Sequence, residues 1–222
     1  MKVSRDLIVR TALQLLDRSG LDELTLRKLA AELGIQAPTL YWHVSSKQAL
    51  IDEMATRVLA EAGPDLVPRK PTEDWTAWVM AFGQGLRKHL LNYRDGGRMV
   101  GGSRLTDTQF QETSERIGTR LLAAGLSHRQ AVVLMSTVYT FTVSFVIEEQ
   151  AVFPRPGERS PAYDLAARSK KLEAAGFPFM RRAGDVLFDQ FDKRFKESLK
   201  LIVGGAQASR GQLPQRAASP KV

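Results

Sequence analysis

Hydrophobic residues recur at three- and four-residue intervals along most of the chain, a pattern that predicts amphipathic helices. One helix is predicted to begin after Thr25, whose hydroxyl is placed to cap it, with Leu26, Leu29 and Leu33 on its apolar face. Gly34 can take the left-handed conformation that ends a helix. The sequence therefore predicts a short helix that stops at a glycine turn.

A second short helix is predicted to start near Ala37, because Pro38 is tolerated in a first helical turn. Leu40 is expected to face inward. The side chains expected on the outer surface are Thr39, Tyr41, Trp42 and His43. Two helices joined by a tight turn also occur in proteins that never contact DNA. Three adjacent large polar-aromatic residues are an unusual way to fill a core, so we favour a helix-turn-helix that contacts phosphates and base edges.

The rest of the chain is predicted to be helical, with glycine and proline at the breaks. The predicted helices span residues 49–61, 75–92, 106–123, 129–152, 164–175 and 185–203, with turns at 93–97 and 101–103 and a stop at 204–205. Apolar residues crowd more than one face of 129–152, so that helix is expected to be buried on several sides. In a homodimer, 129–152 and 185–203 would pair with their symmetry mates as a four-helix bundle; alternatively, both complete the monomer core. The fold class is all-α.

The motifs of the N-terminal part resemble the DNA-binding domain of the tetracycline-repressor family over residues 7–59. The matching motifs are Gly20, the run LTLRKLA at 24–30, LGI at 33–35 and PTLYWHVSSK at 38–47. The resemblance implies an all-helical, homodimeric, ligand-controlled transcriptional repressor that binds a DNA operator. It implies a helix-turn-helix domain at 1–47, a helical ligand-binding and dimerisation domain at 48–204 and a disordered polar tail at 205–222. The residues expected to contact DNA are Thr25, Arg27, Lys28, Ala37, Pro38, Thr39, Tyr41, Trp42, His43 and Lys47.

A weaker resemblance extends to the effector-binding region of the same family, where a magnesium-chelated tetracycline is held by a histidine, an asparagine, a phenylalanine, a glutamine and a glutamate. The aligned positions are Val100, Phe82, Leu86, Arg116 and Glu148, and only the acid is retained. Without the imidazole, a metal chelate loses its protein ligand, so the expected effector is a small, largely apolar molecule. The expected pocket has walls of Phe82, Leu86, Val100, Phe141 and Phe145 and polar anchors at Ser103, Arg104 and Glu148.

Composition changes this interpretation little. The net charge is +8, but residues 1–48 carry seven basic and five acidic residues, which leaves only +2 on the predicted DNA-binding domain. The absence of cysteine and the scatter of His43, His89 and His128 argue against a metal centre, and no cofactor is expected. We expect no membrane span and no leader peptide, and hence a cytoplasmic protein.

Two other classes of function remain as alternatives. No nucleophile elbow, phosphate loop or HExxH motif is present, so no catalytic residue is expected and a helical-bundle enzyme is the distant alternative. A helical dimer that binds a small molecule without DNA is the second alternative, against which Arg27, Tyr41, His43 and Lys47 argue. A transcriptional activator would share every feature of a repressor described above.

Overall fold

The computed structural model describes residues 3–70 and 72–209, and within these residues it contains helices and no strand. The all-α prediction is confirmed. The helices are α1 (Arg5–Ser19), α2 (Leu26–Glu32), α3 (Ala37–Tyr41), α4 (Lys47–Ala62), α5 (Trp75–Leu90), α6 (Gly96–Val100), α7 (Gln109–Ala123), α8 (His128–Val152), α9 (Leu165–Ala174), α10 (Pro178–Phe188) and α11 (Phe191–Ser209), with short 3₁₀ segments at Gly63–Leu66 and Pro161–Tyr163.

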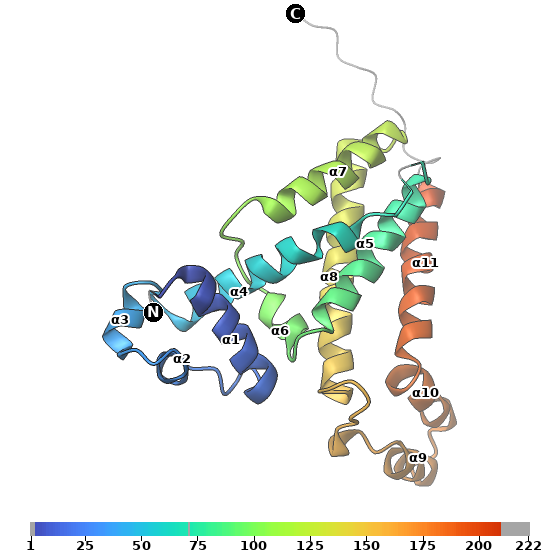
Figure 1. The fold of residues 1–222 in the computed structure, drawn as a ribbon. Coiled ribbons are helices and arrows are strands. Elements are labelled where there is room, and N and C mark those ends of the chain that lie inside the picture. Colours follow the sequence, from blue (N-terminus) through green and yellow to red (C-terminus); the bar gives the residue numbers. More distant parts are fainter. Residues whose placement is uncertain (1–2, 71, 210–222) are drawn as a thin grey trace, which may run out of the picture.

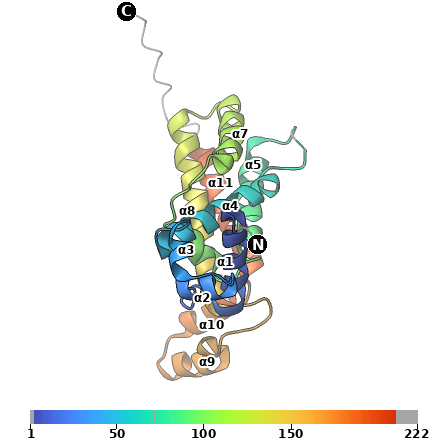
Figure 2. The same ribbon diagram turned by 60° about the vertical axis from the view of Figure 1, so that its left-hand side comes forward.

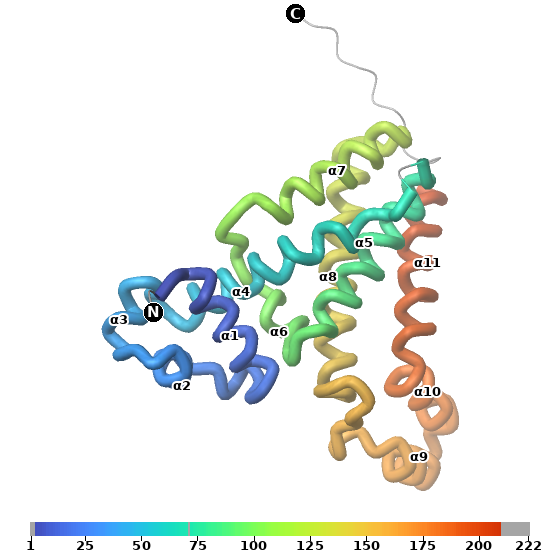
Figure 3. The backbone as a smooth tube through the Cα atoms, viewed as in Figure 1, coloured from blue at the N-terminus to red at the C-terminus, as the bar shows by residue number. Residues whose placement is uncertain are grey.

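The molecule has a small head and a larger body (Figure 1). Helices α1 to α3 form the head, and α4 leads from the head into the body, where it packs against α5, α6 and α7. Helices α5, α8 and α11 lie along one another in the body, with α7 against α8 (Figure 2). Helices α9 and α10 form a hairpin beyond the end of α8 (Figure 3). The predicted boundary at residues 47–48 falls in the first turn of α4, so one helix belongs to both parts.

Helices α1, α2 and α4 begin at side-chain caps. The hydroxyls of Ser4, Thr25 and Ser46 accept hydrogen bonds from the backbone N–H three residues later, at 3.2, 3.2 and 3.0 Å. Gly34 has a φ of 67°, the left-handed conformation expected from the sequence. The turn between α2 and α3 is therefore set by local sequence, as predicted.

Helix α8 is the central helix of the body. It starts with a reciprocal capping box between Ser127 and Gln130 and packs against α5, α6, α7 and α11. The expectation that no segment is long enough to span a membrane overlooked this helix, because the 18 residues from Gln130 to Ile147 carry no charge. By length and composition alone α8 could cross a bilayer, and core helices of globular proteins pass the same test.

Two boundaries differ from the sequence prediction near the middle of the chain. Residues 93–97 were expected to form a turn, but α6 begins inside that segment at Gly96. Helix α7 begins at Gln109 rather than at residue 106, because both the N–H and the hydroxyl of Thr106 bond to the hydroxyl of Thr56, at 2.9 and 3.2 Å. These contacts hold residue 106 against α4 and outside the helix.

The C-terminal helix prediction was wrong inside the predicted segment and at its C-terminal end. Residues 185–203 are divided between α10 and α11, because Asp189 leaves helical geometry (φ −133°) and pairs with Arg159. No glycine or proline marks this break. At the other end α11 continues through Gly204 and Gly205 to Ser209, so residues 205–209 are helical rather than part of a disordered tail. Residues 210–222 of the predicted tail lie outside the described residues.

Candidate nucleic-acid interface and ligand cavity

The end of α3 carries the most exposed aromatic side chains of the head. Trp42 is 89% exposed and Tyr41 is 54% exposed, whereas Leu40, between α3 and the core, is fully buried. Thr39 and Pro38 are also exposed, and Ala37 and His43 are half-buried. Burying an indole normally stabilises a protein, so an indole left almost wholly in water on a polar surface indicates a binding surface.

The basic residues near α3 have different environments. Arg27 is exposed, while Lys28 pairs with Glu23 on the surface. Lys47 is half-buried, and its Nζ donates a hydrogen bond to the carbonyl of Leu21 at 3.0 Å. The ammonium of Lys47 therefore ties the start of α4 to the loop before α2.

A network of polar contacts joins the head to α6. Asp95, which has a φ of 56°, accepts a hydrogen bond from the N–H of Leu21 through its Oδ2 at 2.8 Å. Arg98 of α6 pairs with Asp22 at 2.7 Å, and the N–H of Arg94 donates to Asp17 at 3.0 Å. Partial burial raises the pKa of Asp17, and the hydrogen bond from the N–H of Arg94 offsets part of this rise. These contacts hold the end of α1 against the turn before α6.

A second set of contacts joins α4 to the segment after α6. The Oδ1 of Asp52 accepts hydrogen bonds from the N–H of Arg104 at 3.1 Å and from the side chain of Gln48 at 2.9 Å. Arg104 thus contributes its backbone here, and its side chain is exposed. Ser103 is also committed locally, since its hydroxyl donates to the carbonyl of Met99 at 2.6 Å.

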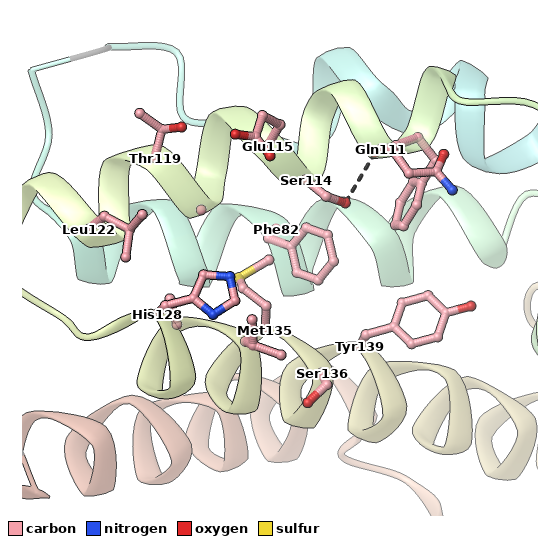
Figure 4. A pocket seen from close by; sticks show the side chains of 14 residues that line it. Phe82, Gln111, Ser114, Glu115, Thr119, Leu122, His128, Met135, Ser136 and Tyr139 are labelled. Atoms are coloured by element: carbon pink, nitrogen blue, oxygen red, sulfur yellow. Dashed lines mark hydrogen bonds between the residues drawn. The ribbon is translucent and has the colours of Figure 1, made fainter. Parts of the chain in front are cut away.

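A cavity of about 470 Å³ lies between α5, α7 and α8 (Figure 4). Its lining residues are Phe82, Phe110, Gln111, Ser114, Glu115, Gly118, Thr119, Leu122, His128, Ala131, Val132, Met135, Ser136 and Tyr139. The ring of Phe110 lies 6.4 Å from that of Phe82 and 6.2 Å from that of Tyr139, so the three rings form one wall. Burial raises the pKa of Tyr139. The volume suits a drug-sized molecule.

Of the residues predicted to bind the effector, Phe82 alone lines this cavity. Leu86 and Val100 are fully buried in the core, Phe141 stacks on Phe195 at 5.4 Å, and Phe145 packs edge-on against the same ring at 4.9 Å. The remaining predicted side chains lie on the surface of the body or beside α4. Arg116 is exposed on α7, and Glu148 is 65% exposed and lies 3.7 Å from Arg194. The structure does not bring these side chains into one cavity.

A buried ion pair of Arg87 lies beside the rings of Phe145 and Phe195. Arg87 donates two hydrogen bonds to Glu149, at 2.8 and 2.6 Å, and also pairs with Asp192 at 2.7 Å. Its guanidinium lies 5.1 Å from the ring centre of Phe195 and 5.8 Å from that of Phe145. The protein's own arginine thus covers the rings that the sequence assigned to a ligand.

Helical spacing was the signal that could have located the cavity. Ala131, Met135 and Tyr139 recur every four residues on α8, and Phe110 and Ser114 do so on α7. Such a spacing places side chains on one face of each helix.

The head ends in an exposed aromatic helix, and α4 joins it to a helical body that contains a cavity. This architecture is typical of a DNA-binding regulator that responds to a ligand. Comparison with protein families agrees. Residues 8–54 match the model of the bacterial regulatory proteins of the tetR family, and residues 67–210 match the tetracyclin repressor-like C-terminal domain. The chain belongs to the tetR family and is a ligand-responsive transcriptional repressor of that family.

Individual relatives extend over most of the chain. The tetracycline repressor of class A from transposon 1721 of Escherichia coli is 40% identical over 85% of this chain and 87% of its own. A possible TetR family transcriptional regulator from Streptomyces coelicolor superposes with a TM-score of 0.81 at 31% identity, over 92% and 99% of the two chains. A class A TetR in complex with 5a,6-anhydrotetracycline and magnesium superposes with a TM-score of 0.65 at 33% identity, over 90% and 96%.

The last of these relatives binds its ligand together with magnesium, so the residues of this chain can be tested against a metal chelate. Val100, aligned with the family's histidine, is an apolar residue of the core with 1% exposure. Within residues 3–70 and 72–209, no group of three or more histidine or acidic side chains is arranged to hold a metal ion. The described side chains do not fit a protein-anchored chelate.

Proposed function

We propose that a homodimer of this chain binds a palindromic DNA operator in the cytoplasm and releases it when a small, largely apolar effector enters the cavity between α5, α7 and α8. The observation that carries the DNA-binding part is the exposure of Trp42 and Tyr41 at the end of α3. No other part of the described head presents comparable aromatic surface. We assign the protein no catalytic activity.

In this proposal α3 enters a major groove and its exposed residues contact base edges. The proposed DNA-contacting residues are Thr25, Arg27, Lys28, Ala37, Pro38, Thr39, Tyr41, Trp42, His43 and Lys47. Arg27 is the basic residue best placed for a phosphate, because it is exposed and has no acidic partner within the described residues. Lys47 also positions α4, because its ammonium donates a hydrogen bond to the carbonyl of Leu21. The half-sites lie about 34–36 Å apart or slightly more.

The outer faces of α8 and α11 support the dimer. Val133 is 51% exposed and Leu201 is 77% exposed, and both line an apolar groove between these helices. Two copies that pair through α8 and α11 would form a four-helix bundle and cover both side chains. Leu201→Glu should turn a dimer into a monomer by sedimentation equilibrium. Leu122→Glu, at an exposed leucine on α7 outside the groove, is the control.

The effector would act on the head through the two helices that line the cavity and also pack on α4. The cavity lies against α5 and α7, and both of these helices pack on α4. A ligand shifts the equilibrium between two head positions only by its difference in affinity for them. An effector that separates α7 from α5 would therefore displace α4 and misalign the two α3 helices.

The DNA-binding part can be tested by fluorescence anisotropy with labelled duplex from the region upstream of the gene. Trp42→Ala should weaken binding by at least about tenfold, the loss of an aromatic hot spot, without changing the thermal unfolding midpoint. Phe179→Ala removes an aromatic ring of comparable exposure (75%) from the body and is the matched control. Equal affinities for Trp42→Ala and the wild type would refute the assignment of α3.

The effector part can be tested by challenging the protein–DNA complex with hydrophobic drugs and with magnesium-tetracycline. Release by an apolar compound but not by the chelate is expected. Phe82→Ala should change that response and leave ligand-free DNA affinity intact; Phe141→Ala, at a ring outside the cavity, should keep the wild-type response. Release by the chelate at a low concentration would contradict the proposed effector class.

A further inference from the structure

Two groups of aromatic rings in the body differ in whether an arginine of the chain lies over them. In one group, an arginine of the chain lies 4.5 to 5.8 Å from the ring centre, which is the distance of a cation–π contact. The rings of this group are Phe145, Phe153, Phe188, Phe191 and Phe195. Phe82, Phe110 and Tyr139 form the other group, over which the described part of the chain places no guanidinium or ammonium.

Phe82, Phe110 and Tyr139 line the cavity, and Figure 4 shows Phe82 and Tyr139 there. Phe110 and Tyr139 are half-buried, so part of their surface is available to a bound molecule. The face of an aromatic ring carries negative electrostatic potential and attracts a cation, most strongly where water is excluded. The cavity therefore offers the kind of surface that elsewhere in this body is occupied by arginine.

The charged groups of the cavity lining favour the same sign. Glu115 of α7 is the one carboxylate in the lining, His128 is the one imidazole, and no lysine or arginine of the described residues belongs to it. The other polar lining residues are neutral: Gln111, Ser114, Thr119 and Ser136. Arg116 and Glu112 are exposed on α7 outside the lining, where solvent screens both charges.

We propose that the effector cavity takes an aromatic cation, a flat ring system that carries a protonated amine. The rings of Phe110 and Tyr139 would contact the cation and the ligand's ring, and Glu115 would attract the ammonium at the rim. The inference rests on the proposed function only in naming this cavity as the effector site. Neutral aromatic molecules of the same shape bind more weakly, and anions bind weakest.

Three probes with one ring system separate charge from shape: 1-naphthylmethylamine is a cation at neutral pH, 1-naphthalenemethanol is neutral and 1-naphthoate is an anion. Their dissociation constants are measured by isothermal titration calorimetry on the full chain without DNA. The cation should bind about tenfold tighter than the alcohol, the combined effect of a cation–π contact and an exposed carboxylate. The alcohol should bind more tightly than the naphthoate.

Two variants assign the preference to its source. Glu115→Gln should reduce the ratio of cation to alcohol affinity about threefold, and Glu112→Gln, at an exposed acid outside the lining, should leave it unchanged. Tyr139→Leu keeps an apolar wall but removes a ring face, so it should reduce the same ratio while the alcohol still binds. Circular dichroism confirms that each variant is folded.

The proposal is overturned if the alcohol binds as tightly as the amine, or if the ratio survives both Glu115→Gln and Tyr139→Leu. Operator release distinguishes this outcome from failure of the proposed function. Neutral drugs that release the operator, together with equal binding of the three probes, would refute the charge preference alone. The amine could instead bind with the expected preference while no compound that occupies the cavity releases the operator. That result would refute the regulatory role alone.

Discussion

Glu149 should be the acidic residue of α8 on which stability depends most. The Glu149→Gln substitution removes the charge that faces Arg87, whose side chain is 12% exposed, as is that of Glu149. Removing one partner of a buried ion pair costs about 3–5 kcal/mol, because the other charge remains in a poorly solvated site. Asp192 still pairs with Arg87, and glutamine keeps one acceptor, so the lower end, about 3 kcal/mol, is expected.

Urea unfolding followed by circular dichroism measures this loss, at one fixed protein concentration because dimerisation contributes to stability. For a chain of this length, about 3 kcal/mol corresponds to a fall in the thermal midpoint of roughly 6–12 °C. Glu148→Gln is the matched control, since its side chain is 65% exposed and its expected effect is below about 0.5 kcal/mol. Equal effects of the two substitutions would refute the claim that the Arg87 pair stabilises the body.

Three further results are expected. Arg98→Ala removes the exposed pair with Asp22 between α6 and the head; it should lower operator affinity by less than about tenfold and change the unfolding free energy by less than about 1 kcal/mol. An unaltered affinity would exclude a role of this pair in head orientation. Burial lowers the pKa of His89, so the unfolded chain takes up the proton first: stability should fall as pH drops from about 7.5 to 5.5, less so in His89→Gln, and identical slopes would contradict this. Gly96→Ala would place Cβ 2.1 Å from the carbonyl oxygen of Leu90 and should cost about 2 kcal/mol or more in urea unfolding; an unchanged unfolding free energy would show that this approach relaxes freely.

Local sequence signals were sufficient for the head. The cap at Thr25, the left-handed Gly34 and the proline at the start of α3 are properties of a few neighbouring residues, and the helices began and ended where those residues indicated. In the body, boundaries followed contacts between distant residues. Thr56 keeps Thr106 outside α7, and no local signal reports that contact.

The two candidate sites also differ in how far the sequence could predict them. The exposed face of α3 could be predicted because each side chain's direction follows from its place in a short helix. The cavity could not be predicted from apolar character, because Phe82 and Phe145 are equally apolar, and arginines distant in the sequence, Arg87 and Arg194, lie over Phe145 and not over the cavity ring. An alignment of single positions assigned roles without knowing these partners.

The hairpin of α9 and α10 buries few of its residues. Gly184 is its one buried residue, and α10 packs on α9 and α11. With so little buried apolar surface, the hairpin should open at a free energy well below that of global unfolding. Its amides should exchange with solvent deuterium while those of α5 and α8 remain protected. The cavity and the head would keep their geometry during such openings, so this end of the molecule can fluctuate or change in sequence without disturbing DNA recognition.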